Sequence, residues 1–112
     1  MIITKTEPFT TEEIRKLQES LDPYIKTVID VRKKICCAGM KRHFEGQERL
    51  TVQGSDSKDV WGGGVDTATK AIDFSSMINI RPTQQNESHV IEDHQLQETY
   101  TVLSEYFFKA IL

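Results

Sequence analysis

The sequence predicts an α+β fold: a small, mainly antiparallel sheet of about four to five strands, packed by an N-terminal and a C-terminal helix, with a short middle helix. Two observations predict the outer helices: a helix-start signal near residue 10, and an apolar segment of helical period from residue 94 onward. Between them, short segments alternate apolar and polar residues, which is typical of strands. At 112 residues, the chain is expected to form a single domain, 1–112, around one core.

The N-terminal helix is predicted by the segment 9–14, F-T-T-E-E-I. Thr10 is expected to cap the helix, and Glu13 to reach back to the Thr10 N–H. Phe9 is expected to pack on Ile14 as a hydrophobic staple. The buried stripe of this helix should comprise Ile14, Leu17 and Leu21.

Short strands are predicted before and after the N-terminal helix. Residues 2–3 suit a first strand, and 25–31 with 34–38 is expected to form a hairpin. The adjacent Cys36 and Cys37 would point to opposite faces of a strand, so they cannot form an unstrained disulfide with each other. Free cysteines and the lack of a membrane-length apolar run predict a cytoplasmic protein with no membrane association.

The segment 71–81 is predicted to be the strand around which the sheet is organised, ending at Pro82, which has no backbone N–H. Before it, 40–53 indicates a weak helix, 58–62 a strand, and 62–64 (Gly-Gly-Gly) a turn or bulge. The two faces of the central strand would carry Ile72, Phe74, Ser76, Ile78 and Ile80 toward the core, and Asp73, Ser75, Met77, Asn79 and Arg81 on the polar side.

A last helix is expected from His94 to about Ile111, capped by Asp93. Three apolar residues fall outside its predicted core stripe, so a second surface of this helix is expected to be covered by another subunit or partner. The protein would then be a homo-oligomer or bind a protein partner through this helix. The stripe comprises Leu96, Tyr100, Leu103, Phe107 and Ala110, and the residues outside it are Val102, Tyr106 and Phe108.

The polar face of the central strand is the first candidate site. Side chains two apart on a strand lie roughly 6 to 7 Å from each other on one face, so Asn79 and Arg81 could together hold an anionic ligand. The guanidinium of Arg81 offers a rigid fork that suits carboxylate or phosphate. Asp73 lies further along the same face. The alternative is a solvated sheet surface with an Arg–Asp salt bridge.

His43 is the second candidate, as a metal ligand or an acid–base group. Its helical neighbour at i+4 is Gln47, a poor metal ligand, and the chain has no H-x-x-x-H and no cysteine pair at zinc spacing. Neither a metal site nor a cofactor is therefore expected. A general base at His43 working with Arg81 remains an alternative, because histidine titrates near neutral pH.

Two basic groups, 32–34 (Arg-Lys-Lys) and 41–42 (Lys-Arg), could attract phosphates. They are separated by a predicted strand and lack interleaved aromatic residues, which favours a solvated hairpin tip. The net charge of −3 also argues against a protein that coats nucleic acid or an anionic membrane. Nucleic acid is therefore an unlikely partner by net charge.

The segment Phe74–Ser88 reads F-x-S-M-I-N-I-R-P-x-Q-x-N-x-S, and it is accompanied by the spacing from His43 to Gly54-Ser55 and by Asp59 and Trp61-Gly62. By these residues the chain resembles a small uncharacterised family, common in cyanobacteria and known only as a domain of unknown function. The resemblance covers most of the chain from the first hairpin onward. It implies a shared fold and no reaction.

The resemblance points to residues of the motif as the site. Family members look to have a hairpin glycine where this chain has Lys34, an acid where it has Gln47, and an arginine where it has Glu87. The residues to which it points are Asn79, Arg81, Asn86 and Ser88. Together with Asp73 and Trp61, these are the candidate ligand-binding residues.

Three functions remain open from the sequence. The leading hypothesis is a non-catalytic binding module for a small anionic ligand or a protein partner, acting as a homo-oligomer or as a subunit of a complex. The first alternative is a small phosphodiester-cleaving or toxin-like ribonuclease that uses His43 as base and Arg81 to stabilise charge. The second is an antitoxin-like partner protein, suggested by small size, acidity and the apolar last helix.

Overall fold

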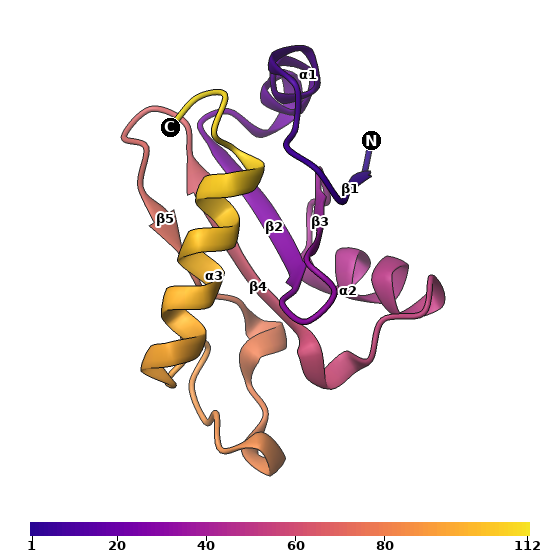
Figure 1. Ribbon diagram of the computed structural model, residues 1–112, viewed down its shortest axis with the longest axis vertical. Coiled ribbons are helices and arrows are strands. Elements are labelled where there is room, and N and C mark those ends of the chain that lie inside the picture. Colours follow the sequence, from indigo (N-terminus) through magenta and orange to yellow (C-terminus); the bar gives the residue numbers. More distant parts are fainter.

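A five-stranded antiparallel sheet forms the centre of the computed structural model, which describes residues 1–112 (Figure 1). The strands lie in the order β1-β3-β2-β4-β5, and the long β2 and β4 pair along their full length in the middle. The predicted α+β fold is thereby confirmed. The strands are β1 (Ile3–Lys5), β2 (Tyr24–Asp30), β3 (Ile35–Ala38), β4 (Val60–Asp66) and β5 (Ile72–Asp73).

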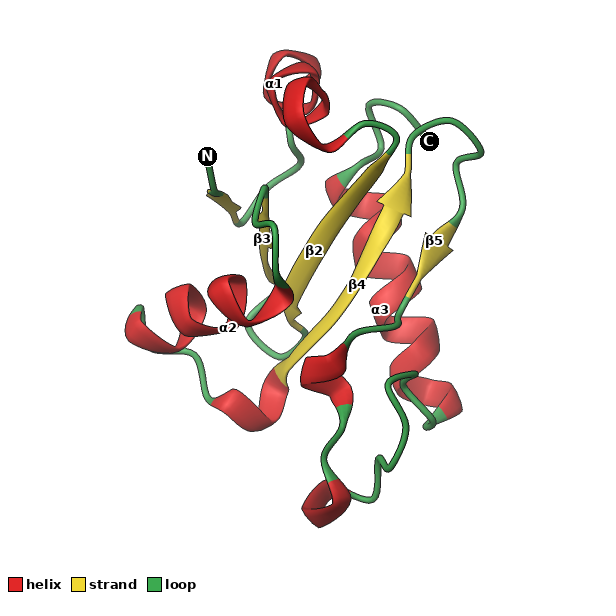
Figure 2. Ribbon diagram, turned by 180° about the vertical axis from the view of Figure 1, so that it is seen from behind, coloured by secondary structure: helices red, strands yellow, loops and turns green.

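Three helices cover the sheet: α1 (Thr11–Leu21), α2 (His43–Val52) and α3 (His94–Phe107). The larger apolar cluster joins α1 and α3 to one face, on which α3 crosses the strands in Figure 1. The smaller cluster joins α2 to the opposite face, which comes to the front in Figure 2. None of the three helices has both the length and the apolar character that a membrane span requires.

The start of α1 agrees with its sequence signal. The Thr10 hydroxyl accepts a hydrogen bond from the Glu13 N–H at 3.1 Å, and the Glu13 carboxylate accepts one from the Thr10 N–H at 2.8 Å. This capping box satisfies two N–H groups that a helix end leaves without partners. Ile14 and Leu17 are buried as expected.

The end of α3 differs from its prediction. The helix ends at Phe107, and Phe108 is fully buried with its ring stacked on Phe9 at a centroid distance of 4.9 Å. Placing Phe108 on a second, outer surface was therefore wrong, because the chain leaves the helix there and turns back toward α1. Val102 and Tyr106 are exposed, as is Ala110, which was expected in the core stripe.

The predicted strand over 71–81 is wrong beyond its first residues. Only Ile72 and Asp73 pair with β4, and the 3₁₀ helix η2 (Met77–Asn79) follows. Short polar side chains offer the backbone local bonds that compete with a sheet ladder. Here the Asp73 carboxylate accepts from the Ser75 N–H, and the Ser76 hydroxyl accepts from the Ile78 N–H. Apolar alternation alone cannot reveal these bonds.

The three consecutive glycines lie inside β4, where a turn or bulge was expected. A Cβ on Gly62 would lie 2.7 Å from the Cβ of Ser76, and one on Gly63 would lie 2.3 Å from the carbonyl oxygen of Asp73. Glycine is needed here because neighbouring chain packs against the strand more closely than a side chain allows.

The predicted hairpin of β2 and β3 is present, and Lys34 lies in its turn with a positive φ. The Asp30 carboxylate accepts hydrogen bonds from the Arg32 and Lys33 N–H groups. Lys34 follows with φ at 58°, in the left-handed region that favours glycine. A glycine at this position would adopt this conformation without strain.

Candidate functional site

The Phe74–Ser88 segment lies against the edge of β4 that β5 leaves open. β5 pairs only with Gly64 and Val65, so the strand edge before them has no neighbouring strand. The side-chain amide of Asn79 takes this place: it accepts from the Gly62 N–H and donates to the Gly62 carbonyl, both at 2.9 Å. One asparagine side chain thus replaces the peptide group of a neighbouring strand.

A second amide holds the segment in shape. Asn79 is fully buried, and its own carbonyl oxygen accepts a hydrogen bond from Nδ2 of Asn86 at 2.8 Å. The same Nδ2 lies 3.0 Å from the carbonyl oxygens of Ser88 and Val90, and Oδ1 of Asn86 accepts from the Glu92 N–H at 2.8 Å. Both asparagine amides are therefore fully used inside the protein.

Arg81 bonds to β4 as well, at the Val60 carbonyl, two residues before Gly62. Its Nε donates to the Ile78 carbonyl at 3.0 Å, its Nη1 to the Ser57 carbonyl at 2.9 Å, and its Nη2 to the Val60 carbonyl. The guanidinium also stacks on the Trp61 ring at 4.2 Å from its centroid. Burial lowers the pKa of Arg81, which stays protonated at neutral pH. The guanidinium fork is occupied by the protein's own backbone.

The remaining predicted ligand-binding residues are also engaged within the chain. Asp73 accepts a hydrogen bond from the Tyr24 hydroxyl at 2.9 Å, and burial together with this carboxylate raises the pKa of Tyr24. Trp61 is buried beneath Arg81, and the Ser88 hydroxyl donates to the Val90 carbonyl. Arg81 and Asp73 form no ion pair; the ion pairs are Lys5–Glu13, Arg15–Glu12 and Lys58–Asp56.

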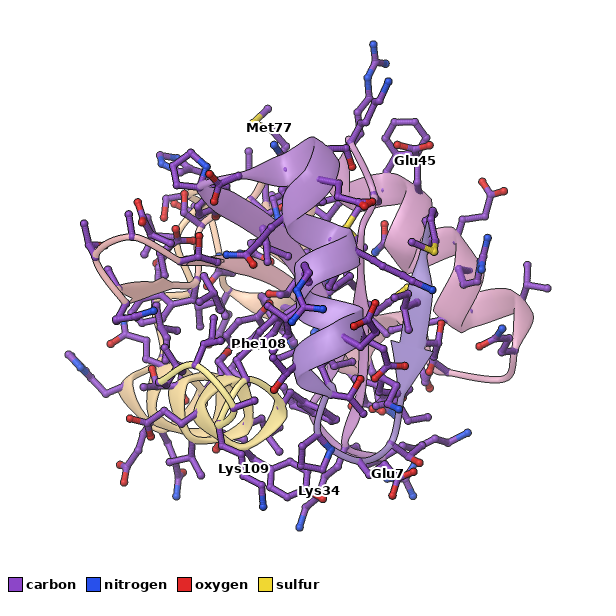
Figure 3. All side chains as sticks on the ribbon, turned by 90° about the horizontal axis from the view of Figure 1, so that it is seen from above. Glu7, Lys34, Glu45, Met77, Phe108 and Lys109 are labelled. Carbon is purple, nitrogen blue, oxygen red and sulfur yellow. The ribbon has the colours of Figure 1, made fainter.

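A different group of polar side chains lines a cavity of about 480 Å³ on the α2 face of the sheet. The first turn of α2 forms one wall and η2 the other, and β2 contributes one lysine. Met77 projects outward at the periphery of the molecule in Figure 3, on the side where α2 also lies. We call this cavity the cationic cleft, and its lining residues are Lys26, Lys41, Arg42, His43, Phe44, Ser76, Met77 and Ile78.

All charged side chains that line the cleft are cationic. Lys26, Lys41 and Arg42 line it, no acidic residue does, and none of these three cations belongs to an ion pair. The N-terminus of α2 opens beside them; the Glu45 carboxylate accepts a hydrogen bond from the Arg42 N–H at 2.9 Å, and no side chain accepts from the N–H groups of His43 and Phe44. A helix N-terminus carries partial positive charge. A positive potential therefore gathers here in a chain whose net charge is −3.

His43 is held in this cleft by the sheet. Its Nε2 lies 2.7 Å from the Gly63 carbonyl oxygen, which can only accept, so Nε2 carries the hydrogen. Burial lowers the pKa of His43, the bond to Gly63 opposes this shift, and the charge of Lys26 adds to it. The imidazole is therefore neutral at neutral pH, with Nδ1 as an unprotonated acceptor that has no hydrogen-bond partner.

His43 and Arg81 do not converge on one point. They bond to the carbonyls of Gly63 and Val60, which are three residues apart on β4 and so about 10 Å from each other at ~3.3 Å per residue. The Arg81 guanidinium also donates to three backbone carbonyls, so its hydrogen-bonding groups are used within the fold. No three His, Cys, Asp or Glu side chains lie together in a way that could hold a metal ion.

Sequence reasoning missed Lys26 and assigned Ser76 to a core face. The signal for Lys26 was present, since it lies between Ile25 and Thr27 and must point away from the face they occupy. Ser76 could not be placed, because its position depends on the turn after β5 and not on strand alternation.

The comparisons with known proteins bear on this chain through one family model. No curated protein and no solved structure matches this chain. The model described as "Protein of unknown function (DUF5674)" matches residues 1–105. The resemblance to an uncharacterised family is thereby confirmed. With nearly its whole length matched, the chain belongs to the DUF5674 family of proteins of unknown function.

Proposed function

We propose that the protein is a non-catalytic binding module for a small anionic ligand, and that the ligand occupies the cationic cleft. One observation carries this proposal: Lys26, Lys41 and Arg42 surround a single cavity without an acidic residue or an ion pair among them. Like charges gathered at one place repel each other, and a bound anion relieves this repulsion.

Neutral groups in the cleft add directional contacts for an anion. The Ser76 hydroxyl oxygen accepts from the Ile78 N–H, so its own hydrogen can be donated to a ligand. The N–H groups of His43 and Phe44 in the first turn of α2 can donate as well, because no side chain accepts from them, whereas the Arg42 N–H is bonded to the Glu45 carboxylate. The sequence prediction of an anionic ligand is kept, while the proposed location moves from Arg81 to the start of α2.

Calorimetric titration with inorganic phosphate and pyrophosphate tests the proposal. We expect the double variant Lys41→Ala/Arg42→Ala to lose at least about tenfold in pyrophosphate affinity, equivalent to ~1.4 kcal/mol. The matched control, Lys16→Ala/Arg32→Ala, removes the same charge from exposed positions outside the cleft and should keep the affinity within about twofold. Absence of binding by the unmodified protein, or equal losses in both variants, would contradict the proposal.

Phosphodiester cleavage with His43 as general base is the second candidate function. It is favoured by one observation, the neutral imidazole whose Nδ1 has no partner inside a cationic cleft. Arg81 takes no part in this version. The test is cleavage of a short RNA by the unmodified protein and by His43→Gln, which can still donate to the Gly63 carbonyl. Cleavage that survives this substitution would rule out the base.

Association through α3 stays a proposal, either as a homo-oligomer or with a protein partner of the antitoxin-like kind. It is supported by Val102 and Tyr106, which are 55% and 42% exposed on this helix. Native mass spectrometry of the purified protein tests it, and a monomer without a co-purifying chain would argue against it. A cytoplasmic location is likewise proposed, because Cys36 and Cys37 are free and buried.

A further inference from the structure

The cationic cleft has an apolar part as well as a charged part. Phe44, in the first turn of α2, is 50% exposed, and Met77, at the start of η2, is 76% exposed. Both line the same cavity, Phe44 from α2 and Met77 from η2. Large apolar side chains so accessible beside a cavity form a surface that a ligand can cover.

An inorganic anion would not cover these apolar side chains. A lone phosphate at Lys26, Lys41 and Arg42 would leave both apolar walls in water. The cavity of about 480 Å³ falls in the range of roughly 300 to 1,000 Å³ that holds small organic ligands. Its volume and lining therefore fit a molecule with an anionic end and an apolar remainder.

We propose that the ligand is a nucleoside phosphate, an inference that rests on the anion-binding function proposed above. The phosphate faces Lys26, Lys41 and Arg42, and the base lies against Phe44 and Met77. Bases stack favourably on aromatic rings, and a methionine sulfur makes favourable contacts with aromatic rings.

Two polar groups with unused hydrogen-bonding capacity suit the sugar of such a ligand. The Nδ1 of His43 accepts a hydrogen bond, and the Ser76 hydroxyl donates one. Hydroxyl groups of a sugar both donate and accept, so they suit this pair. The cleft thus offers one class of contact to each part of a nucleotide.

A single nucleotide fits better than a nucleic acid strand. The other basic group, at 32–34, lies at the β2–β3 turn, about 20 Å along β2 from Lys26 at ~3.3 Å per residue. No basic residue lies on β2 between the two places, and the net charge of −3 opposes binding of a polyanion.

Calorimetric titration with ADP, GDP, CDP and UDP, compared with pyrophosphate and with adenosine, tests the inference. We expect at least one nucleoside diphosphate to bind about tenfold or more tightly than pyrophosphate. The variant Phe44→Ala should abolish this advantage and leave pyrophosphate affinity unchanged. The matched control is Val52→Ala, since Val52 is 81% exposed on the same helix and does not line the cleft.

The outcomes separate this inference from the function on which it rests. If pyrophosphate binds through Lys41 and Arg42 but no nucleotide binds more tightly, the inference of a nucleotide ligand is overturned and the anion-binding function stands. If neither binds, both fail. Adenosine binding as tightly as ADP would overturn the role of the cations. An RNA oligonucleotide binding more tightly than every mononucleotide would overturn the single-nucleotide ligand.

Discussion

Two polar regions flank β4, and their side chains are used in opposite ways. In the segment from Phe74 to Ser88, the side chains of Asn79, Arg81 and Asn86 bond to backbone groups of the same protein. In the cationic cleft, Lys26, Lys41 and Arg42 have no acidic partner. The first region closes a sheet edge, and the second leaves charge available.

This difference teaches how a polar motif should be interpreted. An open strand edge presents unpaired N–H and C=O groups that invite pairing with another chain. Asn79 and Arg81 satisfy such groups on β4, so a polar pattern that resembles a ligand site in the sequence serves the fold. Ligand binding is better sought where polar groups lack internal partners.

The largest expected effect is the loss of Asn79. We expect Asn79→Ala to lower the free energy of unfolding by about 3 kcal/mol, because it leaves the buried N–H and C=O of Gly62 without partners. Urea denaturation measures this change.

Lys26→Met is the contrasting variant. Its free energy of unfolding should stay within about 0.5 kcal/mol of that of the unmodified protein, while its pyrophosphate affinity falls. A stable Asn79→Ala protein would break the comparison.

Arg81 should show a smaller effect of the same kind. We expect Arg81→Met to lower the free energy of unfolding by about 2 kcal/mol, through loss of three hydrogen bonds to carbonyls and of the cation–π contact with Trp61. Pyrophosphate affinity should not change. The comparison would fail if Arg81→Met kept full stability and lost anion binding, since Arg81 would then be a ligand residue.

His43 should make stability depend on pH. Its pKa in the folded protein lies below the ordinary value of about 6.5, owing first to burial and also to Lys26, with the Gly63 carbonyl and Asp73 acting in the opposite direction. The unfolded chain therefore binds this proton more readily. The contribution of neutral His43 is fully present above about pH 6.5 and is lost as the pH falls through the lower, folded-state pKa.

Denaturation curves of the unmodified protein and of His43→Gln between about pH 5 and pH 8 measure this contribution. The difference between the two proteins should shrink toward low pH, and the other two histidines cancel because both proteins contain them. Saturating pyrophosphate should reduce the loss, because an anion in the cleft favours the imidazolium. A difference that does not vary with pH would contradict the buried, neutral state of His43.

The smallest expected effect concerns the basic group outside the cleft. We expect Lys34→Gly to raise the free energy of unfolding by roughly 0.5 to 1 kcal/mol, because Lys34 has φ at 58° and glycine adopts this conformation without strain. Pyrophosphate binding should be unaffected. The control is Arg32→Gly, at a position of the same turn without positive φ, which should not gain stability.

The local elements of the fold follow from the sequence alone. The capping box at Thr10 and Glu13, the cap at Asp93 and the hairpin of β2 and β3 all depend on residues a few positions apart. Such signals can be recognised in a sequence because the groups that interact are already neighbours in the chain. The positive charge of Lys41 and Arg42 could be noticed in the same way.

The tertiary structure alone decided what the middle of the chain does. The segment 71–81 alternates like a strand, yet it leaves the sheet after Asp73 because Asn79 and Arg81 meet backbone groups of β4 some 17 to 21 residues away in the sequence. The glycines of β4 and the meeting of Lys26 with the start of α2 depend on equally distant neighbours. Whether a polar side chain is available to a ligand depends on which partners folding brings to it, and sequence spacing does not contain that information.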